Sequence, residues 1–214
     1  MTTDLFTEQR PDVIQLAAGA CWLPGFALPA MDTLWPYLQQ HLASNPPQRM
    51  MTPMGYFMSV QTSSLGSLGW VSDAQGYGYS ATNPVTGEPW APLPDMILQL
   101  AAAAANKAGY ADFVPDSCLV NVYAPGSKMG LHQDKDEQDF SQPIVSVSLG
   151  LPATFLFGGK TRSDKPVKIP LQHGDVVVWG GPSRRFYHGV NTIKPGMHPL
   201  TGNRRINLTL RRAG

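Results

Sequence analysis

The sequence predicts a mainly β protein, a double-sheet sandwich or jelly roll with two flanking N-terminal helices. Six short runs rich in β-branched and aromatic residues follow residue 115, and turns containing glycine or proline separate them. Two stretches with helical spacing come before these runs, whereas the first thirty residues show no clear period. No repeat or persuasive linker interrupts the 214 residues, so we expect one domain over residues 1–214.

The first predicted helix has one apolar stripe, made of Leu34, Leu38 and Leu42. We expect Asp32 to cap this helix, which places Pro36 within the first turn, where proline costs least. Asn45-Pro46-Pro47 ends the pattern. The second helix is expected over residues 94–108, with Gly109 as the residue that ends it. The predicted strands span residues 118–123, 144–149, 154–157, 175–179, 186–190 and 205–210.

The composition excludes several classes of protein. Hydrophobic residues make up 43% of the chain and charged residues 14%, which rules out intrinsic disorder. No apolar run approaches the ~18 residues of a membrane helix, and the first residues lack the pattern of a secretory signal. Cys21 and Cys118 lack metal-type spacing, so we expect buried thiols in a cytoplasmic protein that has no membrane contact.

Charge is divided unevenly along the chain. Residues 1–127 carry three basic and nine acidic residues, a balance of −6, and residues 128–214 carry thirteen and six, a balance of +7. A basic half on a nearly neutral protein is typical of an anionic partner such as nucleic acid or a carboxylate. A solvated surface balanced by the acidic half explains the same counts, so charge alone leaves both interpretations open.

Residues 50–87 combine methionines, aromatic residues and glycines with a single charge, that of Asp73. The methionines and aromatic residues are Met50, Met51, Met54, Met58, Tyr56, Phe57, Trp70, Tyr77 and Tyr79. Methionine-rich and aromatic surfaces adapt to flat ligands, and aromatic faces stack on bases. The alternative is a pair of hairpins that lies across the sheets and buries these side chains.

His132-Gln133-Asp134 is the strongest local signal for chemistry. In an extended segment, residues two apart point to the same side, so His132 and Asp134 are able to hold one ion. His188 lies 54 residues beyond Asp134 and completes two histidines and one carboxylate, the facial triad of non-haem Fe(II) oxygenases. His-x-Asp is common by chance, and a structural zinc site in a non-enzymatic binding module is the competing interpretation.

The last predicted strand alternates strictly between polar and apolar residues. A strand places its polar side chains on one face, and these are Arg205, Asn207, Thr209 and Arg211. Two guanidinium groups around an amide form a strong trap for a carboxylate, because the planar fork matches a carboxylate in bidentate fashion. An ordinary surface strand shows the same alternation. A metal with open positions beside such a trap fits an acidic co-substrate that chelates the metal.

The remaining histidines have no partners that the sequence identifies. We expect His41 on a helix surface, His198 on a loop surface and His173 in a turn. Gly159-Lys160-Thr161 lacks the rest of a phosphate-binding loop, and Gly-x-Ser-x-Gly is absent. Neither nucleotide hydrolysis nor serine hydrolysis is therefore supported.

Several blocks of the sequence share the pattern of one family. They are Leu68-Gly-Trp70, Gln75-Gly-Tyr77-Gly-Tyr79-Ser80, Asn121-Val-Tyr123-Ala-Pro-Gly, Leu131-His-Gln-Asp-Lys-Asp-Glu137, Pro143 to Pro152, His173 to Gly181, Phe186-Tyr-His-Gly189 and Arg205-Ile-Asn-Leu-Thr-Leu-Arg211. With these blocks the chain resembles the AlkB family of Fe(II)/2-oxoglutarate-dependent dioxygenases, its bacterial members in particular, from about residue 45 onward. The resemblance implies a double-stranded β-helix (jelly-roll) catalytic core at about 115–214 and a nucleotide-recognition lid at about 46–90.

The resemblance also implies roles for individual residues. The residues that match the iron ligands are His132, Asp134 and His188. Those that match the 2-oxoglutarate site are Asn121, Tyr123, Arg205, Asn207 and Arg211. Those that match contacts to the damaged nucleotide are Thr52, Tyr56, Met58, Trp70, Tyr77, Tyr79, Asp136 and Arg162. Val122 departs from the family pattern, which has a basic residue at this position.

The implied activity is oxidative dealkylation of N1-methyladenine and N3-methylcytosine in alkylated single-stranded DNA, with double-stranded DNA and RNA as further candidates. The implied cofactor is Fe(II), and the implied co-substrates are 2-oxoglutarate and O2. The reaction releases an aldehyde, succinate and CO2. We expect the enzyme to be a monomer. These methylated bases are cationic, so a carboxylate at Asp136 favours them, and stacking between Trp70 and His132 holds an unstacked base. The alternative is the same fold acting on a protein or a small molecule.

Overall fold

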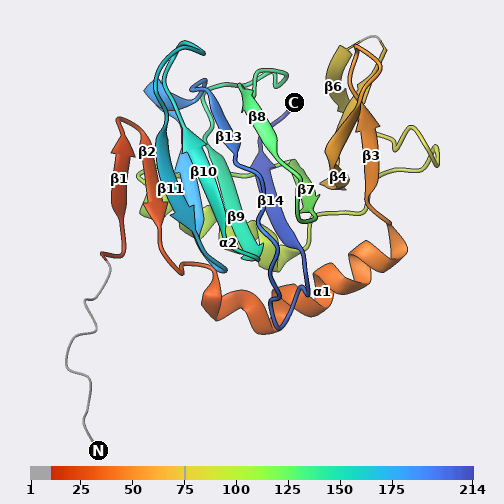
Figure 1. Ribbon diagram of the computed structural model, residues 1–214, viewed down its shortest axis with the longest axis horizontal. Coiled ribbons are helices and arrows are strands. Elements are labelled where there is room, and N and C mark those ends of the chain that lie inside the picture. The colour runs from red at the N-terminus through yellow and green to blue at the C-terminus, as the bar shows by residue number, and fades with distance from the viewer. Residues whose placement is uncertain (1–10, 75) are drawn as a thin grey trace, which may run out of the picture.

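Two facing β-sheets form the body of the protein in the computed structural model, which describes residues 11–74 and 76–214 (Figure 1). In spatial order, the large sheet contains β1 (Ile14–Ala17), β2 (Ala20–Leu23), β12 (Val176–Trp179), β9 (Ile144–Gly150), β14 (Arg205–Arg211), β7 (Ser117–Tyr123), β4 (Phe57–Gly66) and β3 (Gln48–Met51). The small sheet contains β11 (Val167–Leu171), β10 (Ala153–Phe157), β13 (His188–Val190) and β8 (Met129–His132). Phe155 of the small sheet and Trp179 of the large sheet pack between them, with ring centroids 5.9 Å apart. The predicted jelly-roll class is confirmed.

The predicted strands agree with the structure. All six correspond, within two residues at either end, to β7, β9, β10, β12, β13 and β14. Outside the segment of residues 46–90, for which no strand bounds are predicted, the sequence pattern misses β1, β2, β8 and β11. The first three are four residues each, too short to establish a period. Pro170 lies within β11, an edge strand of the small sheet, where a proline is tolerated but hides the strand signal.

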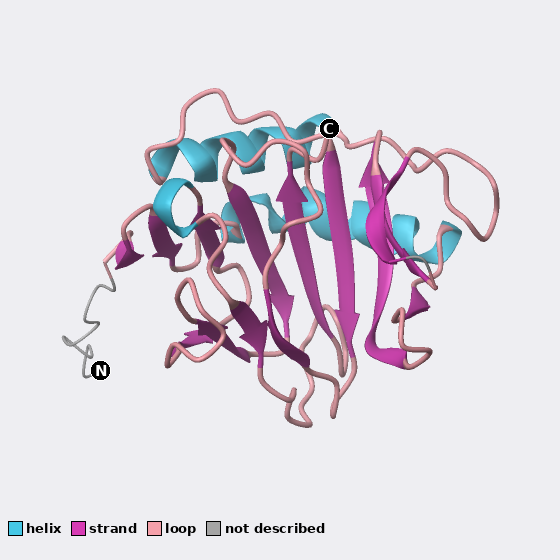
Figure 2. Ribbon diagram, turned by 90° about the horizontal axis from the view of Figure 1, so that it is seen from above, coloured by secondary structure: helices cyan, strands magenta, loops and turns pink. Residues whose placement is uncertain are grey.

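Two helices, α1 (Met31–Ser44) and α2 (Asp95–Lys107), lie on one side of the large sheet (Figure 2). Leu38 and Ile97 from these helices share one apolar core with Val120 and Leu208 from the sheet. The two predicted helices are therefore confirmed. No helix in the described part of the chain is long and apolar enough to cross a membrane. The predicted absence of a secretory signal concerns residues 1–10, which lie outside the described residues.

The start of α1 differs from the prediction. The helix begins at Met31, directly after a 3-10 turn at Leu28–Ala30, so Asp32 lies inside the first turn and does not cap the helix. Pro36 consequently falls in the second turn, where the proline ring removes the hydrogen bond to the carbonyl of Asp32. Both residues are exposed, so water is able to satisfy that carbonyl.

The segment predicted as a lid, residues 46–90, divides into two parts. β3 and β4 extend the large sheet at its edge, where β4 pairs with β7. β5 (Gly69–Asp73) and β6 (Gly76–Ser80) form a separate two-stranded hairpin beside them (Figure 1). Met54, Tyr56 and Phe57 are 80%, 68% and 65% exposed. The alternative in which hairpins bury these side chains is therefore wrong.

Alternation along the central strands positions the cavity between the sheets. On β14, Ile206 and Leu208 point into the core beneath the helices, whereas Arg205 and Asn207 line the space between the sheets. Val122 of β7 belongs to the core beneath the helices. This departure from the family pattern therefore faces away from the cavity.

His41 is buried, so the prediction of a surface position is wrong. It follows Leu38 by three residues and therefore shares the buried face of α1. Its Nε2 lies 3.0 Å from Ser63 Oγ on β4, which joins the helix to the large sheet. Burial lowers the pKa of His41 below its usual value.

We expect His41 to make the protein less stable as the pH falls below about 6.5. His41 binds a proton more readily in the unfolded chain than in the folded chain. Its contribution to the free energy of unfolding is therefore complete above the pKa of the unfolded chain and is lost as the pH falls below that value. The loss is at most about 1.4 kcal/mol per pH unit. Thermal unfolding at about pH 7.5 and about pH 5.5 measures this effect in the wild type and in His41→Gln. The variant should lose less Tm over the interval, and an equal loss in both proteins would contradict this assignment.

Candidate metal and co-substrate site

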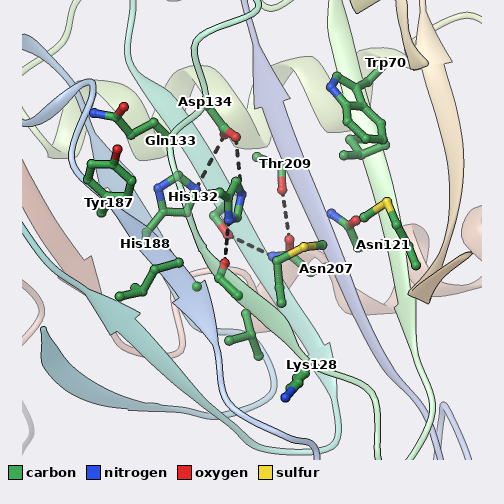
Figure 3. Close-up of a pocket in the computed structure, with 18 of the residues that line it drawn as sticks. Trp70, Asn121, Lys128, His132, Gln133, Asp134, Tyr187, His188, Asn207 and Thr209 are labelled. Carbon is green, nitrogen blue, oxygen red and sulfur yellow. Dashed lines mark hydrogen bonds and ion pairs between the residues drawn. The ribbon is translucent and has the colours of Figure 1, made fainter. Parts of the chain in front are cut away.

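Two histidines and one aspartate meet between the two sheets (Figure 3). His132 ends β8 and pairs with His188, the first residue of the neighbouring strand β13. The carboxylate oxygens of Asp134 lie 3.5 Å from His132 Nε2 and 3.7 Å from His188 Nε2. One ligand atom from each residue lies within 4.8 Å of the others. The fold thus brings the three residues together, and two imidazoles with one carboxylate suit Fe(II).

Backbone carbonyls fix both imidazole rings. His132 Nδ1 lies 2.9 Å from the carbonyl oxygen of Gly130, and His188 Nδ1 lies 3.0 Å from that of Phe186. A carbonyl only accepts a hydrogen bond, so each Nδ1 carries the proton and each Nε2 keeps its lone pair for a metal. Burial and the neighbouring His132 lower the pKa of His188 to about 4, which keeps this ring neutral near pH 7.

Asp134 is a buried carboxylate that keeps its charge. Burial alone would raise its pKa, but Arg211 and the two histidines lower it well below its usual value. Arg211 donates from Nη2 and from Nε to Asp134 Oδ2, at 2.6 and 3.0 Å. The guanidinium occupies one carboxylate oxygen and leaves the other for a metal.

Arg205 is a buried cation whose guanidinium is only partly satisfied. It is 1% exposed, its Nη2 donates to Ser148 Oγ at 3.1 Å, and its Nε and Nη1 lack a hydrogen-bond partner. Within the described residues, no carboxylate pairs with it. The ring of Tyr123 covers one face, with its centroid 5.0 Å from Cζ. An unpaired buried guanidinium is costly, so this position suits an anion such as a carboxylate of 2-oxoglutarate.

The two asparagines of the predicted co-substrate site differ in how many of their side-chain polar atoms form hydrogen bonds within the protein. Asn121 is buried, and its Oδ1 has no hydrogen-bond partner. Asn207 donates to Ser146 Oγ and to the carbonyl of Val147, and accepts from Thr209 Oγ1. These three contacts occupy the amide of Asn207, whereas Asn121 keeps a free acceptor. The geometry favours a role for Asn207 in shaping the cavity.

A cavity of about 630 Å³ joins the histidines, the buried arginines and the β5–β6 hairpin, and this volume is typical of small-molecule sites. The predicted residues that line it are Thr52, Met58, Trp70, Tyr77, Asn121, Tyr123, His132, Asp134, Asp136, Arg162, His188, Arg205, Asn207 and Arg211. Two predicted substrate residues do not line it. Tyr56 lies exposed in the loop before β4, and Tyr79 is directed toward Glu137 and Arg211.

The rim of the cavity carries aromatic and charged groups. Trp70 Nε1 donates to Asp136 Oδ2 at 3.1 Å, and the Trp70 ring stacks on Tyr77 with centroids 5.5 Å apart. Lys128 and Arg162 add positive charge to the lining. An aromatic plane beside a carboxylate suits a flat, cationic ligand, and the basic groups suit a neighbouring phosphate.

Sequence reasoning missed several residues of the site. Glu137 and Arg184 are buried and form an ion pair of 3.3 Å behind Asp134. Glu137 lies in an acidic run that is typical of an exposed loop, so no local signal identifies it. Gln133 and Lys135 also line the cavity. They are the sequence neighbours of Asp134, and this position was the signal that could have predicted their place in the site.

The fold and the site together define a class of protein. A double-stranded β-helix presents two histidines and one carboxylate, a set that leaves three octahedral positions open on Fe(II). A buried, unpaired arginine in the same cavity suits the carboxylate of a co-substrate that chelates the metal. These features define an Fe(II)- and 2-oxoglutarate-dependent oxygenase.

Comparison with known proteins agrees with this class. A family model described as the 2OG-Fe(II) oxygenase superfamily matches residues 19–211. The chain is 52% identical to the alpha-ketoglutarate-dependent dioxygenase AlkB of Escherichia coli (strain K12), over 99% of this chain and 98% of that protein. It is 38% identical to the DNA N(6)-methyladenine demethylase ALKBH1A of Arabidopsis thaliana, over 62% of this chain and 39% of that protein. The solved structure of OsALKBH1 matches with a TM-score of 0.75 at 33% identity, covering 94% of this chain and 99% of that chain.

The chain belongs to the AlkB family of the 2OG-Fe(II) oxygenase superfamily. Membership gives it Fe(II) as cofactor and 2-oxoglutarate and O2 as co-substrates. The donor set of His132, Asp134 and His188 and the unpaired nitrogens of Arg205 fit these two groups.

Proposed function

We propose that this enzyme removes alkyl groups oxidatively from cationic bases, of the N1-methyladenine and N3-methylcytosine type, in single-stranded DNA. The similarity to AlkB and to a protein named as a DNA demethylase supports nucleic acid as the substrate class of the enzyme. The observation that carries the finer proposal is the contact of Trp70 with Asp136 at the rim of the cavity that holds the metal ligands. Double-stranded DNA and RNA are the further candidate substrates.

The residues of the cavity divide the chemistry between them. The chemistry that Fe(II) would supply here is oxidation by O2: one oxygen atom would convert 2-oxoglutarate to succinate and CO2, and the other would hydroxylate the N-alkyl carbon, which would then leave as an aldehyde. His132, Asp134 and His188 would hold the metal through two imidazole nitrogens and one carboxylate oxygen. Arg205 and Arg211 hold the carboxylates of 2-oxoglutarate, with Tyr123 and Asn121 beside them.

The base must leave its stack to reach this cavity, because the alkylated nitrogen lies on its Watson–Crick edge. Trp70 on β5 and His132 on β8 both line the cavity, and we place the base between their rings. A single strand needs no unpairing, which saves a few kcal/mol relative to a duplex. The proposal of a single-stranded substrate rests on this difference.

Basic residues suit the phosphate backbone next to the base. Lys128, Lys135 and Arg162 line the cavity and offer contacts that do not depend on sequence. The metal ligands, the buried arginines and the rim aromatic groups of one chain already form a single cavity, and we propose that a monomer acts, as one domain over residues 1–214. Within it, β3 to β6 contact the nucleotide, with Thr52, Met58 and Tyr77 in the cavity wall.

The two alternatives are less well supported. A structural zinc site needs a fourth protein ligand, and the ligand group found in the described residues has three members. An oxygenase for a protein or a small molecule does not require the exposed aromatic and methionine surface of Met54, Tyr56 and Phe57. Stacking on bases gives that surface a use.

Asp136→Asn should impair repair of cationic bases more than repair of neutral adducts. A carboxylate about 4 Å from a cation contributes about 4 kcal/mol at an effective dielectric constant of about 20, before desolvation reduces it. We therefore expect kcat/KM for N1-methyladenine to fall about 10- to 100-fold, with a smaller change for 1,N6-ethenoadenine. The measurement uses both bases in the same single-stranded sequence.

The choice of asparagine separates charge from position. An amide oxygen still accepts the hydrogen bond of Trp70 Nε1, whereas Asp136→Ala removes both the charge and this contact. The alanine variant should therefore also slow repair of the neutral adduct. An equal change on both bases in Asp136→Asn would show that Asp136 does not select by charge.

A turnover panel tests the proposed function. Succinate formation is measured with no nucleic acid, with methylated single-stranded DNA, with the same sequence as a duplex and with methylated RNA. The proposal predicts the largest stimulation by the methylated single strand. Stimulation by none of the nucleic acids would favour a protein or small-molecule substrate.

A further inference from the structure

Four buried charged groups form a closed ring of contacts around the metal ligand Asp134. Arg211 Nη2 lies 2.6 Å from Asp134 Oδ2, and Arg211 Nε lies 3.2 Å from Glu137 Oε1. Arg184 Nη2 lies 3.3 Å from Glu137 Oε2, and Arg184 Nη1 donates to the backbone carbonyl of Asp134 at 3.1 Å. The ring therefore holds both the carboxylate and the backbone of Asp134.

Glu137 is the member of this ring whose side-chain carboxylate contacts both arginines. Its side chain is 1% exposed, so its charge is stable only because Arg184 and Arg211 surround it. The ring contains two cations and two anions, and it is neutral overall. Without the charge of Glu137 the ring becomes cationic, and Arg211 loses the partner opposite Asp134. Both changes oppose binding of a divalent cation next to Asp134.

Tyr79 links the β5–β6 hairpin to the same ring. Its hydroxyl donates to Glu137 Oε1 at 3.1 Å and accepts from Arg211 Nη1 at 3.4 Å. Burial raises the pKa of Tyr79, so the hydroxyl stays a donor. Tyr79 is the register partner of Trp70 on the neighbouring strand, and Trp70 in turn donates to Asp136. The cross-strand pair Trp70 and Tyr79 thus hydrogen-bonds to Asp136 and Glu137, which follow Asp134 by two and three positions.

We propose that Glu137 is a positioning residue for the metal ligand Asp134, and that Tyr79 makes the β5–β6 hairpin part of the same unit. Trp70 and Tyr77 of this hairpin line the cavity, so a base that orders the hairpin also orders the ring around Asp134. Occupation of the cavity and metal binding then strengthen each other. This second part rests on the proposed function, whereas the role of Glu137 does not.

The role of Glu137 is tested by metal affinity without nucleic acid. Calorimetric titration with Mn(II), a redox-stable probe for the iron site, is applied to the wild type and to Glu137→Gln, which keeps the shape but removes the charge. We expect the Kd to rise about 10- to 100-fold, the usual effect of losing a group that orients a metal ligand. A Kd within about twofold of the wild type would overturn the proposal, whatever the Tm of the variant.

Tyr79→Phe is the second variant, and it keeps the aromatic ring in place. It should weaken Mn(II) binding in the same direction as Glu137→Gln, by a smaller factor. Tyr110→Phe is the matched control, because it also removes a tyrosine hydroxyl that joins two segments, at 2.7 Å from the carbonyl of Gly19 and outside the cavity. The control should keep the affinity of the wild type. A loss of affinity shared by both tyrosine variants would show a general effect of packing and overturn the link.

The coupling is tested by repeating these titrations with a saturating single-stranded oligonucleotide that carries one N3-methylcytosine. In the wild type and in Tyr110→Phe the oligonucleotide should tighten Mn(II) binding at least about fivefold. In Tyr79→Phe this ratio should fall to about one. An equal ratio in all three proteins, or no tightening in the wild type, would overturn the coupling. Fluorescence anisotropy records oligonucleotide binding separately: failure of the wild type to bind it overturns the proposed function, and the Mn(II) titration of Glu137→Gln still decides the positioning role.

Discussion

Replacing Asp134 with alanine should abolish turnover of both 2-oxoglutarate and the methylated base. Asp134 is the anionic member of the proposed metal triad, and Arg211 binds the same carboxylate. The substitution removes a metal ligand and leaves a buried guanidinium without this partner, and breaking a buried ion pair costs about 3–5 kcal/mol. The loss should therefore exceed what a missing hydrogen bond alone causes.

Succinate formation at limiting iron measures this effect. Asp139→Ala is the matched control, because Asp139 lies in the same acidic run but does not line the cavity. The control should turn over at the rate of the wild type. Succinate formation by Asp134→Ala at that same rate would exclude Asp134 as an iron ligand.

Arg205→Ala should chiefly raise the concentration of 2-oxoglutarate that the enzyme requires. The guanidinium is buried, and two of its nitrogens have no partner in the protein. A buried hydrogen bond to a charged group contributes about 1.5–3 kcal/mol, which corresponds to about 10- to 150-fold in affinity. The KM for the oligonucleotide should change little, because Arg205 lies on the side of the cavity formed by the large sheet.

The matched control for this variant is Arg204→Ala. Arg204 is the preceding residue, is exposed and does not line the cavity, so its loss should leave both KM values unchanged. Calorimetric titration of 2-oxoglutarate adds a binding constant that does not depend on turnover. If Arg205→Ala lost affinity for the oligonucleotide while its affinity for 2-oxoglutarate stayed normal, Arg205 would face a different ligand.

The sequence predicts the central strands well because apolar or β-branched residues recur along each of them, at every second position in β14. β7, β9 and β14 are buried along their whole length, and they carry much of the cavity. The alternation of β14 correctly places Arg205 and Arg211 on one face, and the spacing of His132 and Asp134 correctly predicts that their side chains lie close together beside one cavity. The local sequence pattern is sufficient to predict a site where the residues that share a function are neighbours along one strand.

Short elements and long-range partners are beyond the reach of local pattern. β2 joins the large sheet by pairing with β12, which lies more than 150 residues away, and β1 then pairs with β2. His41 is polar, yet Ser63 on another element gives it a partner, so its burial depends on tertiary structure. Glu137 lies among residues typical of an exposed loop, and only the fold brings Arg184 to it.

The family resemblance supplied roles that the physical pattern leaves open. Residue type and spacing indicate a metal beside a carboxylate trap, but they do not distinguish Fe(II) from a structural zinc or name 2-oxoglutarate. Tyr79 shows the limit of carrying roles over from a family. Its hydroxyl donates to Glu137 and it does not line the cavity, so the geometry gives no support to the contact with the nucleotide that the family implies.

The most direct test of the account is the product formed from a single-stranded oligonucleotide that carries one N3-methylcytosine. The wild type is incubated with Fe(II), 2-oxoglutarate and O2, and mass spectrometry follows the oligonucleotide while formaldehyde and succinate are quantified. We predict an oligonucleotide that contains unmodified cytosine, with formaldehyde and succinate formed in equal amounts. An unchanged oligonucleotide beside continuing formation of succinate would contradict the account, because the oxygenase would then be intact but the methylated base would not be its substrate.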